Sequence, residues 1–169
     1  MGTRGLVLLL AVAAGLCFAA IAIGASSPKH ITRSGVGQVK LGKTYKQLRN
    51  KHLIGSIRHG CELGGPNTRS ARLRAPLKGS VNFTLTTPRK VTDITVSAGA
   101  TARGIGIGAT IAQIKAKFPK AKVDHSTDQT FEFTLVKIPK NGGGRIAFAV
   151  STKTHKTTLI GIPIIAVCE

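Results

Sequence analysis

The sequence predicts an α+β protein built from two tandem copies of a short helix packed on an antiparallel β-sheet. The first observation is internal repetition: residues 39–51 align with residues 105–117 at a shift of 66, and residues 72–94 align with 137–159 at a shift of 65. A register that slips by one position over such a span indicates two copies of one unit. The second observation is a helix-start signal that occurs once in each copy, and the third is a series of alternating apolar and polar segments.

The helix-start signal is a threonine followed three residues later by a glutamine. It predicts two capping boxes, one formed by Thr44 with Gln47 and one by Thr110 with Gln113. In such a box the threonine hydroxyl accepts from the third backbone N–H, and the glutamine reaches back to the cap. Short helices are therefore expected over 45–52 and 111–118, each with an apolar stripe facing a sheet.

Alternating segments predict the strands. They are expected at 36–41, 69–75, 81–86 and 90–96 in the first copy, and at 103–107, 129–138, 145–151, 155–162 and 164–168 in the second. Pro88 and the run 141–144 are turn signals. The expected organisation is a leader over 1–25, a flexible lead-in over 26–34, a first α+β repeat over 35–100 and a second over 101–169.

Residues 6–23 form an uncharged apolar run that follows Arg4. The small residues Gly24, Ala25 and Ser26 come next, as expected near a signal-peptide cleavage site. The run is longer than most signal peptides need, so an uncleaved N-terminal anchor is the alternative. In either case Arg4 keeps the N-terminus inside, and the rest of the chain is expected outside the cytoplasmic membrane, secreted or exposed on the envelope.

Two cysteines follow the leader, Cys61 and Cys168. An even number in an exported chain predicts a disulfide, here one that ties the first copy to the last strand of the second. The chain-entropy model gives a loop of this length roughly 4–5 kcal/mol of stabilisation. The alternatives are two buried thiols or a bond between two molecules.

The chain is strongly basic, with a net charge of +19 that becomes +18 without Arg4. Such a charge attracts acidic polymers, acidic proteins and anionic surfaces, although it can also serve solubility alone. The densest basic stretch is 69–78, in which Arg72 and Arg74 alternate with apolar residues. The candidate contacts with an acidic partner are Arg69, Arg72, Arg74, Lys78, Arg89 and Lys90.

No motif predicts catalysis or a cofactor. Residues 37–44 match the phosphate-loop pattern, but their alternation indicates a strand and a capped helix, so no nucleotide site is expected. His59 and Cys61 lack a second pair of metal ligands. His125, Ser126 and Asp128 have the side chains of a hydrolytic triad, but they share one polar loop without a strand–turn nucleophile.

The segments Leu41-Gly42-Lys43-Thr44 and Ile107-Gly108-Ala109-Thr110, each followed by a Gln-Leu or Gln-Ile pair, resemble known repeats. They are similar to the β-lactamase-inhibitor-protein-like family and to outer-membrane assembly lipoproteins of the SmpA/OmlA type. This resemblance implies a tandem helix-on-sheet fold over most of the exported chain. It also implies inhibition of an exported enzyme as an activity.

The sequence thus predicts an exported, non-enzymatic binding module for an acidic polymer or acidic protein. The alternative is a proteinaceous inhibitor of an exported enzyme, and an enzyme of another type is a third hypothesis. With no tryptophan and one tyrosine, the chain offers few of the aromatic anchors found in tight protein interfaces. Its arginines are the anchors that remain.

Overall fold

The computed structural model describes residues 27–61, 65–139 and 144–166. In chain order the elements are β1 (Lys29–Thr32), β2 (Gly35–Val36), β3 (Val39–Lys40), α1 (Tyr45–Asn50), β4 (Ile54–His59), β5 (Arg69–Leu73), β6 (Lys78–Phe83), β7 (Val91–Ala98), β8 (Ala100–Thr101), α2 (Ile111–Lys117), β9 (Lys122–Asp124), α3 (Asp128–Phe131), β10 (Phe133–Ile138), β11 (Ile146–Ser151) and β12 (Thr157–Ile162). The class is α+β, as predicted.

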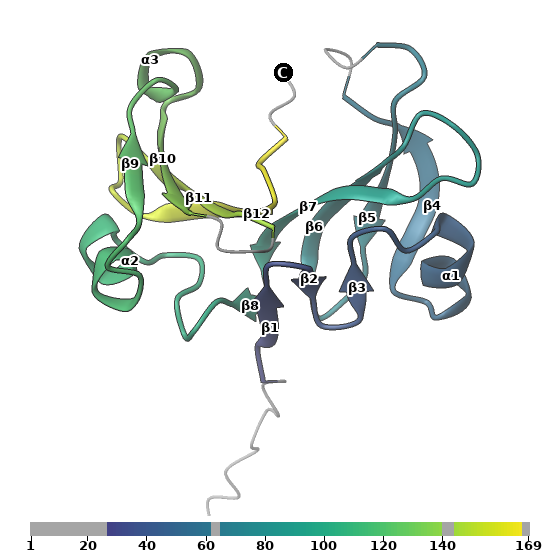
Figure 1. The fold of residues 1–169 in the computed structure, drawn as a ribbon, viewed down its shortest axis with the longest axis horizontal. Helices are drawn as coiled ribbons and strands as arrows, with labels where there is room; N and C mark the ends of the chain where they lie inside the picture. The colour runs from purple at the N-terminus through teal and green to yellow at the C-terminus, as the bar shows by residue number, and fades with distance from the viewer. Residues whose placement is uncertain (1–26, 62–64, 140–143, 167–169) are drawn as a thin grey trace, which may run out of the picture.

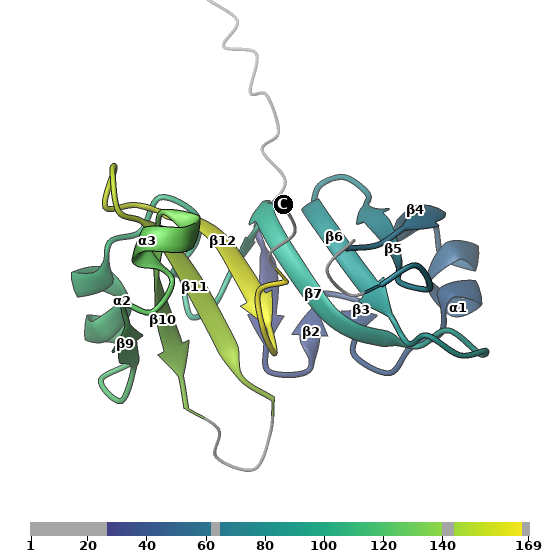
Figure 2. The ribbon, with the colours of Figure 1, turned by 90° about the horizontal axis from the view of Figure 1, so that it is seen from above.

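The main element is an eight-stranded sheet with the order β4-β5-β6-β7-β12-β11-β10-β9. Neighbouring strands in it are antiparallel. Figure 1 shows this sheet as a curved layer, with β7 and β12 at its centre and β4 and β9 at its ends. Figure 2 shows the strands of the two halves side by side, each half flanked by its own helix.

The convex face of the sheet is covered. In Figure 1, α1, α2 and a small second sheet of order β3-β2-β1-β8 lie on that side, while the segment after β12 runs on the other side. Leu48 of α1 and Ile114 of α2 are the buried side chains of the two helices, and both belong to the main hydrophobic cluster. Tyr45 of α1 and Ile111 of α2 are partly buried and pack against the same cluster, so each helix contributes a short inward-facing apolar stripe.

Side chains on the helix-facing side of the strands build the core, and β7, β11 and β12 also bury consecutive residues. Val81 and Phe83 on β6, like Phe148 and Val150 on β11, point to the covered face and are buried. Ile94, Val96, Ile160 and Ile162 of the two central strands are fully buried. Every second residue of a strand lies on the same face of the sheet, and residues opposite each other on paired strands are neighbours there. One hydrophobic cluster therefore extends through both halves.

Both capping boxes are present. The hydroxyl of Thr44 accepts from the Gln47 N–H at 3.2 Å, and the Gln47 side chain accepts from the Thr44 N–H at 3.0 Å. Thr110 and Gln113 make the same two bonds at 3.3 and 2.9 Å. The glycine two residues before each threonine, at 42 or 108, has a φ of +77° or +85°. These positive angles allow the chain to turn from the small sheet into the helix.

Equivalent pairs of main-chain hydrogen bonds hold the turn before α1 and the turn before α2 to the sheet. Gly42 donates to Val91 and Val91 donates to Lys43, each at 2.9 Å. In the second half Gly108 donates to Thr157 and Thr157 donates to Ala109, each at 2.8 Å. These links place the start of α1 beside β7 and the start of α2 beside β12.

The opening segment of each half differs from the prediction. Residues 36–41 are not one strand, because Gly37 has a φ of +52° and the chain turns back between β2 and β3. Residues 103–107 contain no extended strand, only an isolated bridge between Ala102 and Ile105. The prediction that residues 26–34 form a flexible lead-in was wrong for Lys29–Thr32, which form β1. There β1 pairs with β2 and, in parallel, with β8.

Other strand boundaries also differ. The predicted strand over 129–138 begins only at Phe133, because Asp128–Phe131 form the short helix α3. The strands β4 and β9 were not predicted. Of the predicted strand over 164–168, residues 164–166 are irregular and the remainder lies outside the described residues. The phosphate-loop match over 37–44 contains the hairpin strand β3 and a helix cap.

The caps give a stability prediction. Replacing Thr44 or Thr110 by alanine should lower the free energy of unfolding by about 1 kcal/mol each, because the third N–H of the helix loses its acceptor. The serine variants keep a hydroxyl and should lose much less. Chemical denaturation of the four variants measures this. Alanine and serine variants of equal stability would contradict it.

The position of Cys61 bears on the predicted disulfide. Its carbonyl accepts from the Thr68 hydroxyl at 2.8 Å, which fixes the chain just after β4. Cys168 lies outside the described residues, so the pairing stays a prediction. In protein purified without reductant, neither Cys61 nor Cys168 should react with an alkylating reagent until a reductant is added, and reduction should cost roughly 4–5 kcal/mol of stability. Alkylation of both cysteines without reductant would refute the bond.

Candidate functional site

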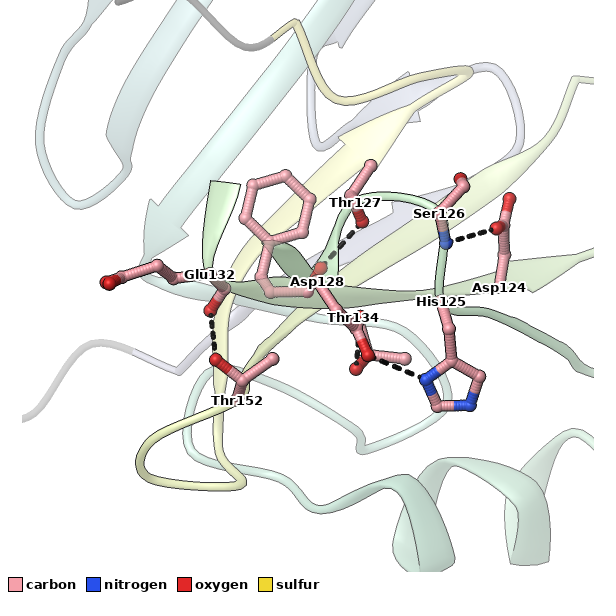
Figure 3. Close-up of polar contacts among 9 residues, drawn as sticks. Asp124, His125, Ser126, Thr127, Asp128, Glu132, Thr134 and Thr152 are labelled. Atoms are coloured by element: carbon pink, nitrogen blue, oxygen red, sulfur yellow. Dashed lines mark hydrogen bonds and ion pairs between the residues drawn. The ribbon is translucent and has the colours of Figure 1, made fainter. Parts of the chain in front are cut away.

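The polar loop singled out in the sequence joins β9 to β10 through α3 (Figure 3). Nδ1 of His125 lies 2.7 Å from Oδ2 of Asp128, and the Thr134 hydroxyl donates to the other oxygen of that carboxylate at 2.8 Å. The hydrogen bond with His125 lowers the pKa of Asp128. The acid–histidine half of a hydrolytic triad is therefore assembled.

Ser126 does not complete it. Its backbone N–H donates to the Asp124 carboxylate at 3.0 Å, and within the described ranges no hydroxyl bonds to Nε2 of His125. Asp124 is also paired with Lys137, whose ammonium holds the pKa of Asp124 well below its usual range. Both carboxylates therefore bind their own loop and its neighbouring strand. Hydrogen bonds of this kind stabilise a polar turn.

The six candidate contact residues separate into two groups. Arg72, Arg74 and Lys78 lie where β5 ends and β6 begins. Arg69 pairs with Phe83, and Phe83 pairs with Val91, so Arg69 lies at the opposite end of these strands, near Arg89 and Lys90. The candidates predicted from the sequence therefore lie at two separate places on the sheet.

The two arginines of the second group bond to main-chain carbonyls. Arg69 donates to the carbonyls of Pro66 and Thr68 at 2.9 and 2.8 Å, and Arg89 donates to that of Thr84 at 3.2 Å. Such bonds close the loop before β5 and the turn between β6 and β7. They give these side chains a structural role.

The first group gains a residue that the sequence analysis missed. Arg58 of β4 pairs with Ser70, which places it on the same face as Arg72. Arg58, Arg72 and Lys78 line one shallow cavity of about 500 Å³ on the first half of the sheet. All three residues are exposed. We call these three residues the basic cluster.

The basic cluster has no carboxylate partner among the residues that the structure describes. The ion pairs there are those of Asp124 with Lys137, Asp128 with His125, and Glu132 with Lys153, and all lie in the second half. The remaining acid of the described ranges, Asp93, is buried. Within the part of the chain that the structure describes, the cluster is therefore a centre of positive charge that no carboxylate neutralises, suited to an external anion.

Asp93 ends a polar row that crosses four strands beside the basic cluster. Pairing places Arg58 opposite Ser70, Ser70 opposite Asn82, and Asn82 opposite Asp93. The Asn82 amide donates to Asp93 at 2.8 Å, and the Thr92 hydroxyl donates to its other oxygen at 2.9 Å. Burial raises the pKa of Asp93, and the two hydrogen bonds act against that rise.

The other kinds of site were searched over the same residues. No group of three or more histidine, cysteine, aspartate or glutamate side chains is arranged to hold a metal in the described ranges. Nor do those ranges contain a helix long and apolar enough to cross a membrane; the run 6–23 lies outside them. The chain matches no protein-family model, no curated protein and no solved structure.

The buried carboxylate gives a pH prediction. Because its pKa is raised in the folded state, the folded protein holds this proton more tightly than the unfolded chain does. The stabilisation that protonated Asp93 contributes is therefore fully present below the ordinary pKa of 3.8 and is lost as the pH rises through the raised pKa. The variant Asp93→Asn keeps an acceptor for Asn82 and removes the titration.

Urea denaturation of both proteins at several pH values between about 4 and about 7 measures this. The stability of the wild type relative to Asp93→Asn should fall as the pH rises. A difference that stays constant over this range would show that burial does not perturb Asp93.

Proposed function

We propose that this chain is an exported, non-enzymatic binding module that recognises an acidic partner through the basic cluster. The observation that carries the proposal is the convergence of Arg58, Arg72 and Lys78 on one exposed cavity with no carboxylate among the described residues to neutralise them. The net charge of +19 adds a general attraction for the same class of partner, which physiological salt screens over about 8 Å.

The chemistry of the cluster favours phosphate, sulfate or carboxylate groups. A guanidinium offers a planar fork of donors that matches such groups, and a lysine adds a mobile point charge. Because three cations share one cavity, the ligand that fits best carries several anionic groups at close spacing. An acidic polymer of the envelope, or an acidic segment of a protein, has this property.

The proposal includes a two-copy architecture. Support comes from the same order of a capped helix and four antiparallel strands in each half, and from the repeated links between the helix start and the last strand. Export rests on the apolar run at residues 6–23 and on Arg4. The two inferences together describe a compact module that works outside the cytoplasmic membrane.

The alternative is an inhibitor of an exported enzyme, as the resemblance implies. The observation that favours it is the curved sheet: α1 and α2 lie on its convex side, and the segment after β12 runs along the centre of the other face, so that the flanks of that face are left for a partner (Figure 1). A protein partner should bind at a fixed stoichiometry and with a weaker dependence on salt than a polyanion.

The test is a triple substitution, Arg58→Gln, Arg72→Gln and Lys78→Gln. Binding of inorganic polyphosphate and of a polyglycerol phosphate is measured at about 50 and about 200 mM salt. Wild-type binding should weaken steeply with salt, and the variant should bind less tightly. Its slope of log Kd against log salt should be smaller by roughly two to three, about one for each cation removed.

The matched control removes three exposed lysines that lie on the helices, through Lys46→Gln, Lys115→Gln and Lys117→Gln. It lowers the net charge equally but leaves the cluster intact. If both triple variants lost the same affinity for the polyanions, the loss would be explained by net charge alone, and the basic cluster would be refuted as the binding site. Stoichiometric binding to one protein, indifferent to salt, would favour the inhibitor.

A further inference from the structure

A second cavity, larger than the one at the basic cluster, lies in the other half of the molecule. It measures about 650 Å³ and is bounded by β1, by the end of α2 and by strands β10 and β11. Its floor consists of apolar side chains from all of these elements. They are Ile31, Phe118, Ala121, Ile138 and Ile146.

The rim of this cavity is cationic. Arg103 and Lys120 line one side, and His30 and Arg33 line the side formed by β1 and the turn after it. No aspartate or glutamate of the described ranges is among the lining residues. An apolar floor beside the cations Arg103 and Lys120 is complementary to a ligand with an apolar body and a negatively charged end.

Arg103 is held in place for such a contact. Its guanidinium carbon lies 5.4 Å from the centre of the Phe118 ring, a cation–π arrangement over the apolar floor. Its φ is +49°, a backbone region that side chains other than glycine, asparagine and aspartate seldom adopt. The angle belongs to the two-residue turn at 103–104, which is closed by paired main-chain hydrogen bonds between Ala102 and Ile105 at 2.8 and 2.9 Å.

Arg33 is fixed from the other side. Its guanidinium donates to the carbonyl of Pro139 at 3.3 Å, which ties the turn after β1 to the end of β10. Small-molecule sites are typically concave, mostly apolar and of about 300–1,000 Å³, with a few polar groups that fix orientation. The cavity meets each of these criteria.

We propose that this cavity binds a single-chain amphiphile with an anionic head, either a carboxylate or a phosphate. The acyl chain lies on Ile31, Phe118 and Ile146, and the head group meets Arg103 and Lys120. A hydrophilic polyanion would leave the apolar floor unused, and a neutral hydrocarbon would leave Arg103 and Lys120 without an anionic partner among the described residues. The site shares no residue with the basic cluster, so it is a separate function from polyanion binding.

Calorimetric titration of the exported chain with octanoate, decanoate and dodecanoate tests the apolar part. Each pair of added methylenes should tighten Kd by roughly tenfold while the chain still fits, since burying a methylene contributes about 0.8 kcal/mol. Decanol, which lacks the charge, should bind at least tenfold more weakly than decanoate. Decyl phosphate should compete with decanoate, which shows that either head is accepted.

Substitution tests the head group. The double variant Arg103→Gln, Lys120→Gln should weaken decanoate binding by tenfold or more and leave decanol binding unchanged. The control Lys115→Gln, Lys117→Gln removes two charges from α2 away from the cavity and should bind decanoate as the wild type does. Amide and methyl NMR shifts at Ile31 and Ile146 should follow the titration.

Three results would overturn the proposal. They are no decanoate binding below its self-association concentration, affinity that does not depend on chain length, and equal losses in the two double variants. Because polyphosphate binding depends on other residues, the triple variant Arg58→Gln, Arg72→Gln, Lys78→Gln should still bind decanoate. Failure at either site is therefore separable from failure at the other.

Discussion

The antiparallel pairing of β7 with β12 is the contact on which the rest of the molecule depends. Its register places Ile94 opposite Ile162 and Val96 opposite Ile160, and all four side chains are fully buried. The pairing joins two four-stranded halves into one sheet, so neither half presents a long unpaired edge at the centre. A half-chain of this size alone would be only marginally stable, whereas the joined halves share one core.

The two faces of that sheet have different chemistry. The convex face is apolar and covered, while the other face carries Ser70, Asn82, Asp93 and Thr95 in the first half, and small residues near the centre. A Cβ at Gly161 would lie 2.1 Å from the carbonyl oxygen of Ile164, so the chain after β12 folds back against the centre of this face. Exposed cations remain at its flank, where the basic cluster lies.

The sequence predicted those features that depend on a few neighbouring residues. Thr44 with Gln47 and Thr110 with Gln113 form their boxes because each contact spans three residues. By contrast, β4 escaped prediction because a register shift between Ile54 and Ile57 interrupts its alternation. Arg58 was missed with it. The carbonyl contacts of Arg69 and Arg89 depend on loop geometry, which no local pattern specifies.

The large cavity illustrates the same limit. Its lining comes from segments more than a hundred residues apart, such as Ile31 and Ile146, and its cations are dispersed along the chain. Each of these residues has an ordinary local explanation: a strand position, a helix end, a surface charge. Only the pairing of β1 with β8, together with the position of α2 against β10 and β11, brings them together. Sites of this kind follow from topology and are not visible in a motif.

The distribution of the acids explains why net charge alone does not locate the site. The described carboxylates outside the core are bound to Lys137, His125 and Lys153, all near α3, where they hold a segment with few strand contacts. At physiological salt a charge acts over about 8 Å, so distant lysines do not reinforce one another. Cations that converge on one cavity do act together. For this reason the grouping of Arg58, Arg72 and Lys78, rather than the total of +19, determines where an anion is held.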